Sequence, residues 1–126
     1  MKRLVLLTAA VVLAGCSYYA DQRTADAAKV QMVGQSRAQV LACMGAPAGS
    51  AIADTSEVWS YGGNDQTVTM LMPAGTAALG VSHTYTCRAH VTFQEGRVVN
   101  VRYQSRGAFD APDYVCGPLV QACVRR

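Results

Sequence analysis

Four of the chain's five cysteines constrain its fold more than any other feature, because they can tie distant segments together. They are Cys43, Cys87, Cys116 and Cys123. An even number of cysteines in a small exported domain is typical of disulfides, and four cysteines allow three pairings. If residues 118–123 are helical, Cys116 and Cys123 lie about 10 Å apart. That exceeds the roughly 7 Å that a disulfide permits between Cα atoms.

The spacing therefore favours bonds from the C-terminal tail to the body of the domain. In these pairings one tail cysteine bonds to Cys43 and the other to Cys87. The alternative joins Cys43 to Cys87 and Cys116 to Cys123, which requires the tail to turn back on itself. A zinc site formed by the cysteines and His90 is a further alternative, but the spacings match no common zinc-finger pattern.

The N-terminal segment bears on this choice, since disulfides form in exported proteins. Lys2 and Arg3 precede an apolar run over residues 4–13. The run is too short to span a bilayer, which takes about 20 apolar residues. A basic start, a short apolar stretch and small residues at the cleavage site are typical of a secretory signal peptide. We therefore expect an exported protein with disulfides rather than a metal site.

The apolar run ends in Leu13-Ala14-Gly15-Cys16, which resembles a bacterial lipobox. The resemblance implies cleavage of a signal peptide over residues 1–15, attachment of lipid to Cys16 and a lipidated tether over 16–23. Three acyl chains would hold the protein firmly in a membrane, since a single chain binds only marginally. In Gram-negative lipoproteins of this class, aspartate after the cysteine tends to retain the protein in the inner membrane. Ser17 therefore favours the outer membrane, on its periplasmic face.

The mature chain, residues 16–126, has the length of one domain with a modest core. We place that domain at residues 24–126. Once the signal peptide is removed, nine basic residues stand beside eight acidic ones. This balance excludes the large basic field that nucleic-acid binding needs. Charge alone therefore identifies no partner.

Two short helices are expected before any strand. The first covers residues 24–32, and the residues that it directs toward the core are Ala27, Val30 and Val33. The second covers residues 37–44, because Ser36-Arg-Ala-Gln39 has the pattern of a capping box. Gly45 and Pro47 then supply a stop signal.

Three strands are expected after these helices. Glu57-Val-Trp-Ser-Tyr61 is rich in strand-forming residues. Residues 83–94 alternate, and one face carries Cys87, Ala89, Val91 and Phe93. After a tight turn at Glu95-Gly96, residues 97–104 form the partner strand, whose inward residues are Val99, Val101 and Tyr103. The sequence thus predicts an α+β fold: two short N-terminal helices packed on a three-stranded antiparallel β-meander, with a disulfide-linked C-terminal tail.

Residues 64–82, between the first two expected strands, have no evident role. Within them, 67–72 is expected to be a further strand or an extension of the first, and 73–80 a mildly apolar loop. Loops often carry binding function, so this loop is a candidate surface, with a plain connecting loop as the alternative. A further loop is expected at 105–113 and a terminal helical turn at 118–124.

Four segments share their order and spacing with a known family. They are Val33-Gly-Gln-Ser-Arg-Ala-Gln-Val40, Met44-Gly-Ala-Pro47, Glu57-Val-Trp-Ser-Tyr61 and Val91-Thr-Phe-Gln-Glu-Gly-Arg-Val98. Behind a lipobox, they resemble the small outer-membrane assembly lipoprotein family of the BamE (SmpA/OmlA) type. The resemblance covers about residues 30–103. It implies two helices packed on a three-stranded sheet and a non-catalytic accessory role in the insertion of β-barrels.

Few residues are candidates for chemistry. The sequence holds no GxSxG, HExxH, P-loop or GxGxxG motif. His83 borders a loop and His90 lies on the outer face of its strand, so both are expected to be surface residues. Trp59 and Tyr61 share one face of their strand. We favour a buried core pair over an aromatic anchor for a partner, because a short domain needs its one tryptophan inside.

The sequence therefore predicts an outer-membrane-anchored periplasmic lipoprotein with a non-catalytic protein-interaction or envelope-scaffold role, similar to BamE. The alternative is a lipid-anchored inhibitor or binding module for a secreted enzyme or toxin. An enzyme with a thiol or metal site is a third, less favoured interpretation. The expected partners are the membrane, through the lipid on Cys16, and an unidentified envelope protein. No nucleic acid, small-molecule substrate, metal or cofactor is expected.

Overall fold

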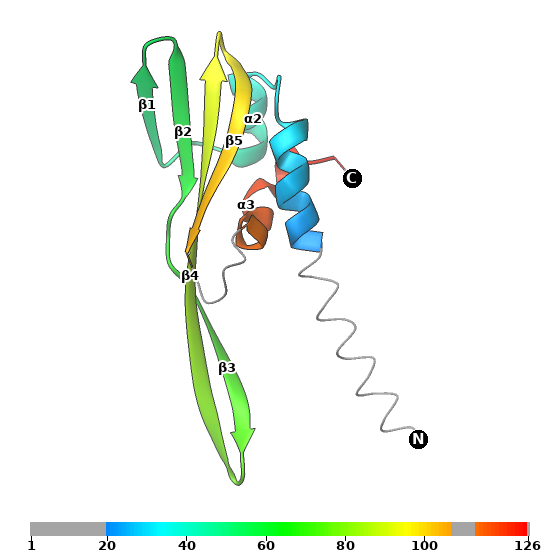
Figure 1. Ribbon diagram of the computed structural model, residues 1–126, viewed down its shortest axis with the longest axis vertical. Coiled ribbons are helices and arrows are strands. Elements are labelled where there is room, and N and C mark those ends of the chain that lie inside the picture. Colours follow the sequence, from blue (N-terminus) through cyan, green and yellow to red (C-terminus); the bar gives the residue numbers. More distant parts are fainter. Residues whose placement is uncertain (1–19, 107–112, 126) are drawn as a thin grey trace.

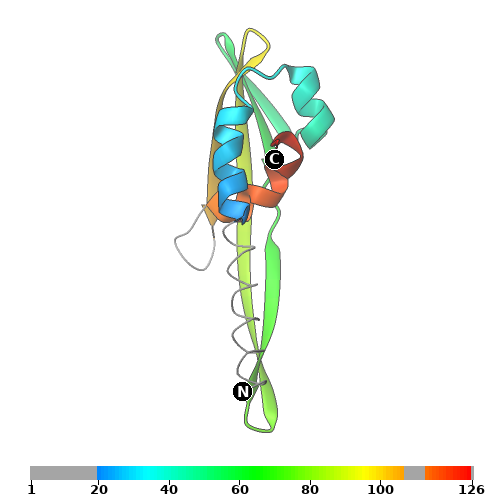
Figure 2. The same ribbon diagram turned by 90° about the vertical axis from the view of Figure 1, so that its right-hand side faces the viewer.

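The computed structural model describes residues 20–106 and 113–125 and is dominated by one antiparallel β-sheet (Figure 1). The strands in the described residues are β1 (Gly49–Ala53), β2 (Ser56–Gly62), β3 (Gln66–Ala74), β4 (Ala77–Gln94) and β5 (Arg97–Arg106). β1, β2, β4 and β5 lie side by side in this order and form the body of the sheet. β3 pairs with the first half of β4, and these two strands project from the body as a long hairpin (Figures 1 and 2).

The predicted fold of two short helices on a three-stranded meander is wrong, because the described chain is mostly β. The hairpin expected at residues 83–94 and 97–104 is present as β4 and β5, and the further strand expected at 67–72 lies within β3, but the sheet also includes β1, which was not predicted. β1 has the sequence GSAIA, and all its residues are exposed. Such a strand has no alternation of buried and exposed residues, and its small residues have low strand propensity. Periodicity therefore cannot reveal it.

Residues 73–80, expected as a loop, instead form the far end of the hairpin between β3 and β4. Pro73, Gly75 and Gly80 are typical of loops, and they hide the strands from a propensity argument. The register leaves Gly75 and Thr76 as a two-residue turn. Gly75 has a φ of 64°, which suits the primed turns that match the twist of paired strands.

A bulge in β5 changes which of its residues face the core. The register passes from the pair Phe93–Val98 to the pair Thr92–Asn100 and leaves Val99 unpaired. Val98 is buried, whereas Val99 is 43% exposed. The expectation that Val99 faces inward is therefore wrong, while the other two predicted inward residues of this strand are buried or half-buried.

Both expected helices exist, but the first buries a different face. It is described over residues 20–31 and so includes part of the expected tether. The buried residues of this segment are Ala25, Ala28 and, just beyond the helix, Met32. Val30 and Val33 are 76% and 48% exposed, contrary to prediction. Small residues face inward because the helix backbone lies close to its neighbours: the Tyr103 hydroxyl donates a hydrogen bond to the Ala25 carbonyl over 2.8 Å.

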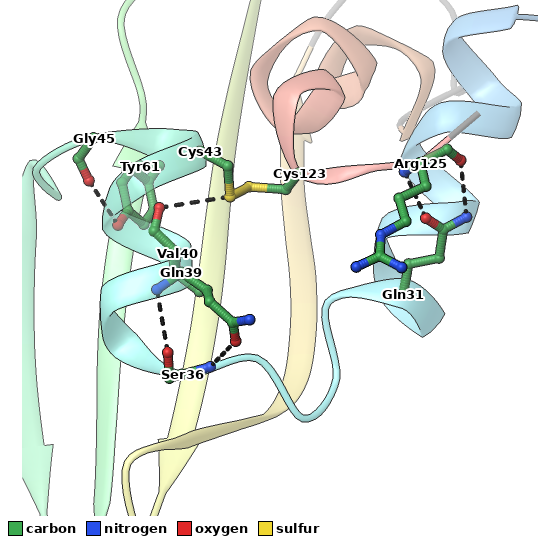
Figure 3. Close-up of a disulfide and its surroundings, with 9 residues drawn as sticks. All are labelled: Gln31, Ser36, Gln39, Val40, Cys43, Gly45, Tyr61, Cys123 and Arg125. Carbon is green, nitrogen blue, oxygen red and sulfur yellow. Dashed lines mark hydrogen bonds between the residues drawn. A yellow bond between two sulfur atoms is a disulfide. The ribbon is translucent and has the colours of Figure 1, made fainter.

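α2 (Arg37–Met44) lies where the sequence predicts, and the capping box is complete (Figure 3). The backbone N–H of Gln39 donates to Ser36 Oγ over 3.2 Å, and the backbone N–H of Ser36 donates to Gln39 Oε1 over 2.8 Å. The helix ends at Gly45, whose φ is 78°. Its inward residue Val40 is fully buried.

Replacement of Ser36 by alanine is expected to lower the free energy of unfolding by about 1 kcal/mol, because the Gln39 amide loses its acceptor. Ser36→Thr keeps a hydroxyl and should restore most of the loss. Urea denaturation measures both variants. Ser50→Ala in the exposed strand β1 is the matched control, and an equal effect at both serines would contradict the role of the cap.

The helices lie on one face of the sheet and cover the core, while no described element covers the opposite face (Figures 1 and 2). The core contains, from the sheet, Trp59, Tyr61, Ala89, Val91, Phe93, Val98 and Val101 and, from the helical side, Met32, Val40 and Val120. The Trp59 and Phe93 ring centroids are 4.6 Å apart. The Tyr61 hydroxyl donates a hydrogen bond to the Gly45 carbonyl. Trp59 and Tyr61 are therefore the core pair that we predict.

Glu57 ties α2 to the sheet at the edge of this core. Trp59 Nε1 donates to its carboxylate over 2.8 Å, and Arg37 pairs with it at 2.7 Å. The hydrogen bond from Trp59, with the hydrogen bond and charge of Arg37, holds the pKa of the Glu57 carboxyl below its usual value, against a smaller opposing effect of desolvation.

Because this pKa is lower in the folded state, the ionised Glu57 stabilises the fold at neutral pH, and the contribution disappears as pH falls below the ordinary glutamate pKa of about 4.3. Glu57→Gln is therefore expected to be less stable than wild type at pH 7, and the difference should shrink at pH 3. Urea denaturation at both pH values measures this. A difference between the two proteins that does not shrink on acidification would contradict the prediction.

The C-terminal tail lies on the helical side and is bonded to the body at two points. Its elements are η1 (Asp113–Cys116), α3 (Gly117–Val120) and η2 (Gln121–Cys123). Cys123 is bonded to Cys43 at the end of α2 (Figure 3), and Cys116 is bonded to Cys87 in β4. Each tail cysteine thus pairs with the body, as the spacing favours, and the helical turn expected at 118–124 is present.

Two further contacts hold the tail against the N-terminal helix. The Gln31 side chain accepts a hydrogen bond from the Arg125 backbone N–H over 2.7 Å and donates one to the Arg125 carbonyl (Figure 3). Gly117 approaches the backbone of Asp21 so closely that a Cβ at this position would lie 2.5 Å from the Asp21 carbonyl oxygen. A side chain larger than hydrogen therefore cannot fit at residue 117.

Candidate protein-binding face

Most residues singled out in the sequence now have a structural role. Cys16 and its neighbours lie outside the described residues, so lipidation stays a prediction. The four remaining cysteines are bonded in pairs, and their sulfur atoms cannot bind zinc as thiolates. His83 has no described side chain. No helix in the described ranges is long and apolar enough to cross a membrane.

The uncovered surface of the sheet is the best candidate for a functional site. We call it the open face and define it by Ser60, Arg88, His90, Arg102, Gln104 and Arg106. Side chains alternate along a strand, so the residues between those that face the core must point to this side. The register places Ser60, His90 and Arg102 in one row across β2, β4 and β5. The next row along the strands pairs Arg88 with Gln104.

Three arginines form a cluster on the open face. Arg88 lies diagonally opposite both Arg102 and Arg106, and diagonal neighbours on adjacent strands are about 7–8 Å apart. All three side chains are exposed. Within the described residues these arginines make no ion pair that would stabilise the sheet.

Two of the cations on the helical side are paired with acids. Lys29 pairs with Asp26 and Asp113, and Arg37 pairs with Glu57. Within the part of the chain that the structure describes, by contrast, no ion pair involves an arginine of the open face. Exposed arginines without an ion pair also occur away from the open face, at Arg23 and Arg125, so the open face is distinguished by carrying three of them at neighbouring positions.

Gly63 makes room for the Arg88 side chain. A Cβ at Gly63 would lie 2.7 Å from Arg88 Nη2 and 2.8 Å from its Nε. The residue also has a φ of 93°, which disfavours other residue types. The guanidinium of Arg88 thus folds back over the turn after β2 and is positioned there by the absence of a side chain.

His90 links the rows of the open face. Its Nδ1 is 3.1 Å from Ser60 Oγ, and its Nε2 is 3.2 Å from Gln104 Oε1. Both ring nitrogens of His90 are therefore engaged by polar side chains of the open face. This confirms that His90 lies on the outer face of its strand.

The Ser60–His90–Gln104 network resembles a hydrolase triad only superficially. In a serine hydrolase the third member is an anion that stabilises the imidazolium formed when serine is deprotonated. Gln104 is neutral and cannot supply that stabilisation. The network is better suited to hold polar groups in fixed positions on a binding surface.

Alternation along the strands indicates part of the open face from the sequence alone. The alternation of β4 places Arg88 and His90 on one face, and that of β5 places Arg102 on the side opposite its inward residues. What the sequence cannot supply is the register between β4 and β5, which makes Arg88 a neighbour of both other arginines. The cluster was therefore not predicted.

No protein-family model, curated protein or solved structure matches this chain, so the resemblance to the BamE type stays a prediction.

Proposed function

We propose that this chain is a non-catalytic lipoprotein, anchored at the periplasmic face of the outer membrane, that binds an acidic surface of an envelope protein on its open face. The arginine cluster is the observation that carries the proposal. Its side chains are exposed at neighbouring positions of one face, and none of the described acids pairs with them. An anionic partner surface would neutralise these arginines and be steered toward them.

The position of the expected anchor favours a protein partner over the membrane itself. Cys16 stands four residues before residue 20. That residue begins the described N-terminal helix, which lies on the helical side of the sheet (Figure 1). The lipid is thus expected on the side of the sheet opposite the open face. This arrangement leaves the open face accessible to proteins of the periplasm.

Co-purification from the outer membrane tests the proposal. The variant Arg88→Glu/Arg102→Glu should lose a bound partner that wild type retains. The control Arg23→Glu/Arg125→Glu has the same net charge and changes exposed arginines away from the open face, and it should keep the partner. The complex should also weaken as salt rises.

Equal retention by both double variants would contradict the proposal. Arginine-dependent binding of the purified chain to anionic vesicles would contradict the choice of a protein partner. The resemblance to the BamE type is tested in the same experiment, because it expects β-barrel assembly proteins in the eluate. Intact mass of the extracted protein tests the anchor separately, since acylation at Cys16 adds a defined mass.

A further inference from the structure

The hairpin of β3 with residues 77–85 of β4, which we call the arm, is unlike the rest of the sheet. It has two strands only, and neither of its faces packs on a described helix (Figures 1 and 2). Isolated two-stranded hairpins are marginally stable in water. A nine-residue strand spans about 30 Å, so the arm reaches far beyond the body.

Polarity changes along the axis of the arm. Near the body, hydroxyl pairs join the two strands: Thr67 to Thr84 at 3.1 Å and Thr69 to Ser82 at 3.0 Å. Beyond these two hydroxyl pairs the large exposed side chains are apolar, and Thr76 in the terminal turn is the polar side chain there. Leu71, Met72 and Leu79 are 74%, 56% and 62% exposed. The arm therefore has a polar base and an apolar tip.

The arm also carries no Asp, Glu, Lys or Arg. None occurs between Asp65 and Arg88. Large exposed apolar residues gathered at one site usually mark a contact surface. An uncharged, apolar tip matches the acyl region of a membrane, and it offers nothing to a partner selected by charge. A second copy of the chain could pair with the edge of β3, but this pairing would leave the apolar faces of the tip exposed to water. It would therefore not explain why the tip is apolar.

The arm points toward the end of the body at which the expected anchor begins. In both views the first described turn of the N-terminal helix lies at the end of the body from which the arm projects (Figures 1 and 2). We infer that the tip of the arm, formed by Leu71, Met72 and Leu79, inserts into the lipid surface as a second membrane contact. The inference rests on the lipid anchor of the proposed function.

Two lengths decide how the arm is oriented to the membrane: that of the segment between Cys16 and residue 20, and that of the arm itself. Cys16 precedes residue 20 by four residues, which reach at most about 14 Å. The arm is longer, at about 30 Å, so an arm perpendicular to the bilayer would drive its open strand edges into hydrocarbon, where unpaired backbone groups are not tolerated. The arm therefore lies oblique to the membrane, and only its tip enters the boundary between headgroups and acyl chains.

Tryptophan reporters in the acylated full chain test this inference. Leu79→Trp places a reporter at the tip, and Thr67→Trp is the matched reporter at the base of the arm. The native Trp59 is buried in the core and gives a constant background. In vesicles of phosphatidylcholine with brominated acyl chains, the tip reporter should be quenched and blue-shifted, and the base reporter should not.

Charge variants sharpen the result. Leu71→Lys should abolish quenching of the Leu79→Trp reporter, whereas Thr84→Lys at the base should not. Addition of anionic phosphatidylglycerol should leave tip quenching unchanged, because the tip has no charge. Equal quenching at tip and base overturns the inference. A blue shift without quenching also overturns it and indicates that a second copy covers the tip.

The experiment can distinguish the absence of the lipid anchor from the absence of a membrane contact at the tip. Intact mass of the reconstituted protein shows whether acyl chains are present. If they are absent, the anchor proposal fails, and the same reporters are measured after the chain is added to preformed vesicles. Quenching at Leu79→Trp there supports the tip contact alone, and its absence refutes it.

Discussion

Removal of the Cys43–Cys123 disulfide, by replacement of both residues with alanine, is expected to lower the free energy of unfolding by about 4 kcal/mol. The bond joins residues separated by 80 positions. In the chain-entropy model, a longer closed loop restricts the unfolded chain more strongly. Cys87–Cys116, with a separation of 29, lies inside this loop and shortens it, so the expected value falls slightly below that of an isolated loop. Guanidinium denaturation under non-reducing conditions measures the loss.

The Cys87–Cys116 disulfide provides the comparison for the loss of stability. Cys87→Ala/Cys116→Ala is expected to cost about 3.5 kcal/mol, because its loop is shorter. The two double variants differ further in what they release: the bond at Cys123 holds the last described turn, whereas the bond at Cys116 holds the start of the tail against β4. A loss below about 1 kcal/mol for both variants would contradict the entropic argument, since native disulfides in small exported domains typically contribute 2–5 kcal/mol.

Local sequence signals predicted the elements that depend on local interactions. The capping box at Ser36 gives α2 within a residue, because its hydrogen bonds join residues three positions apart. The β4–β5 hairpin follows from alternation and from the turn at Glu95-Gly96, where both residues have positive φ. The preference for bonds between tail and body followed from the distance along a helical turn, which is again a local quantity.

Features that depend on tertiary packing were not predicted. Ala25 and Ala28 are buried in place of the larger Val30, so the helix turns toward the sheet a face that its most apolar residues do not mark. Most of β3 lies in residues 67–72, which were expected to be strand, whereas Pro73, Gly75 and Gly80 favour a loop at the tip of the arm, where only the pairing of β3 with β4 reveals the strands. The arginine cluster required the register between two strands, which alternation within either strand does not determine.

Phe93→Ala is expected to lower the free energy of unfolding by about 3–5 kcal/mol, as large-to-small changes of buried aromatic residues typically do. Phe93 is fully buried on β4, and it is among the largest fully buried side chains described. Its ring packs on Trp59, and the Arg37 guanidinium lies 5.9 Å from its centroid. Alanine would therefore leave a cavity at the point where α2 meets the sheet, and urea denaturation would measure the cost.

Phe93→Leu and Val99→Ala separate cavity formation from other effects. Leucine would fill much of the cavity, so Phe93→Leu should lower the free energy of unfolding clearly less than Phe93→Ala does. Val99 is adjacent in space on β5 but is 43% exposed in the bulge, so its truncation should change stability by less than about 1 kcal/mol. Because Trp59 contacts the Phe93 ring, its fluorescence in the folded state should shift in Phe93→Ala and remain unchanged in Val99→Ala. An equal loss in the alanine and leucine variants would mean that the shape of the ring, rather than its volume, fixes the position of α2 on the sheet.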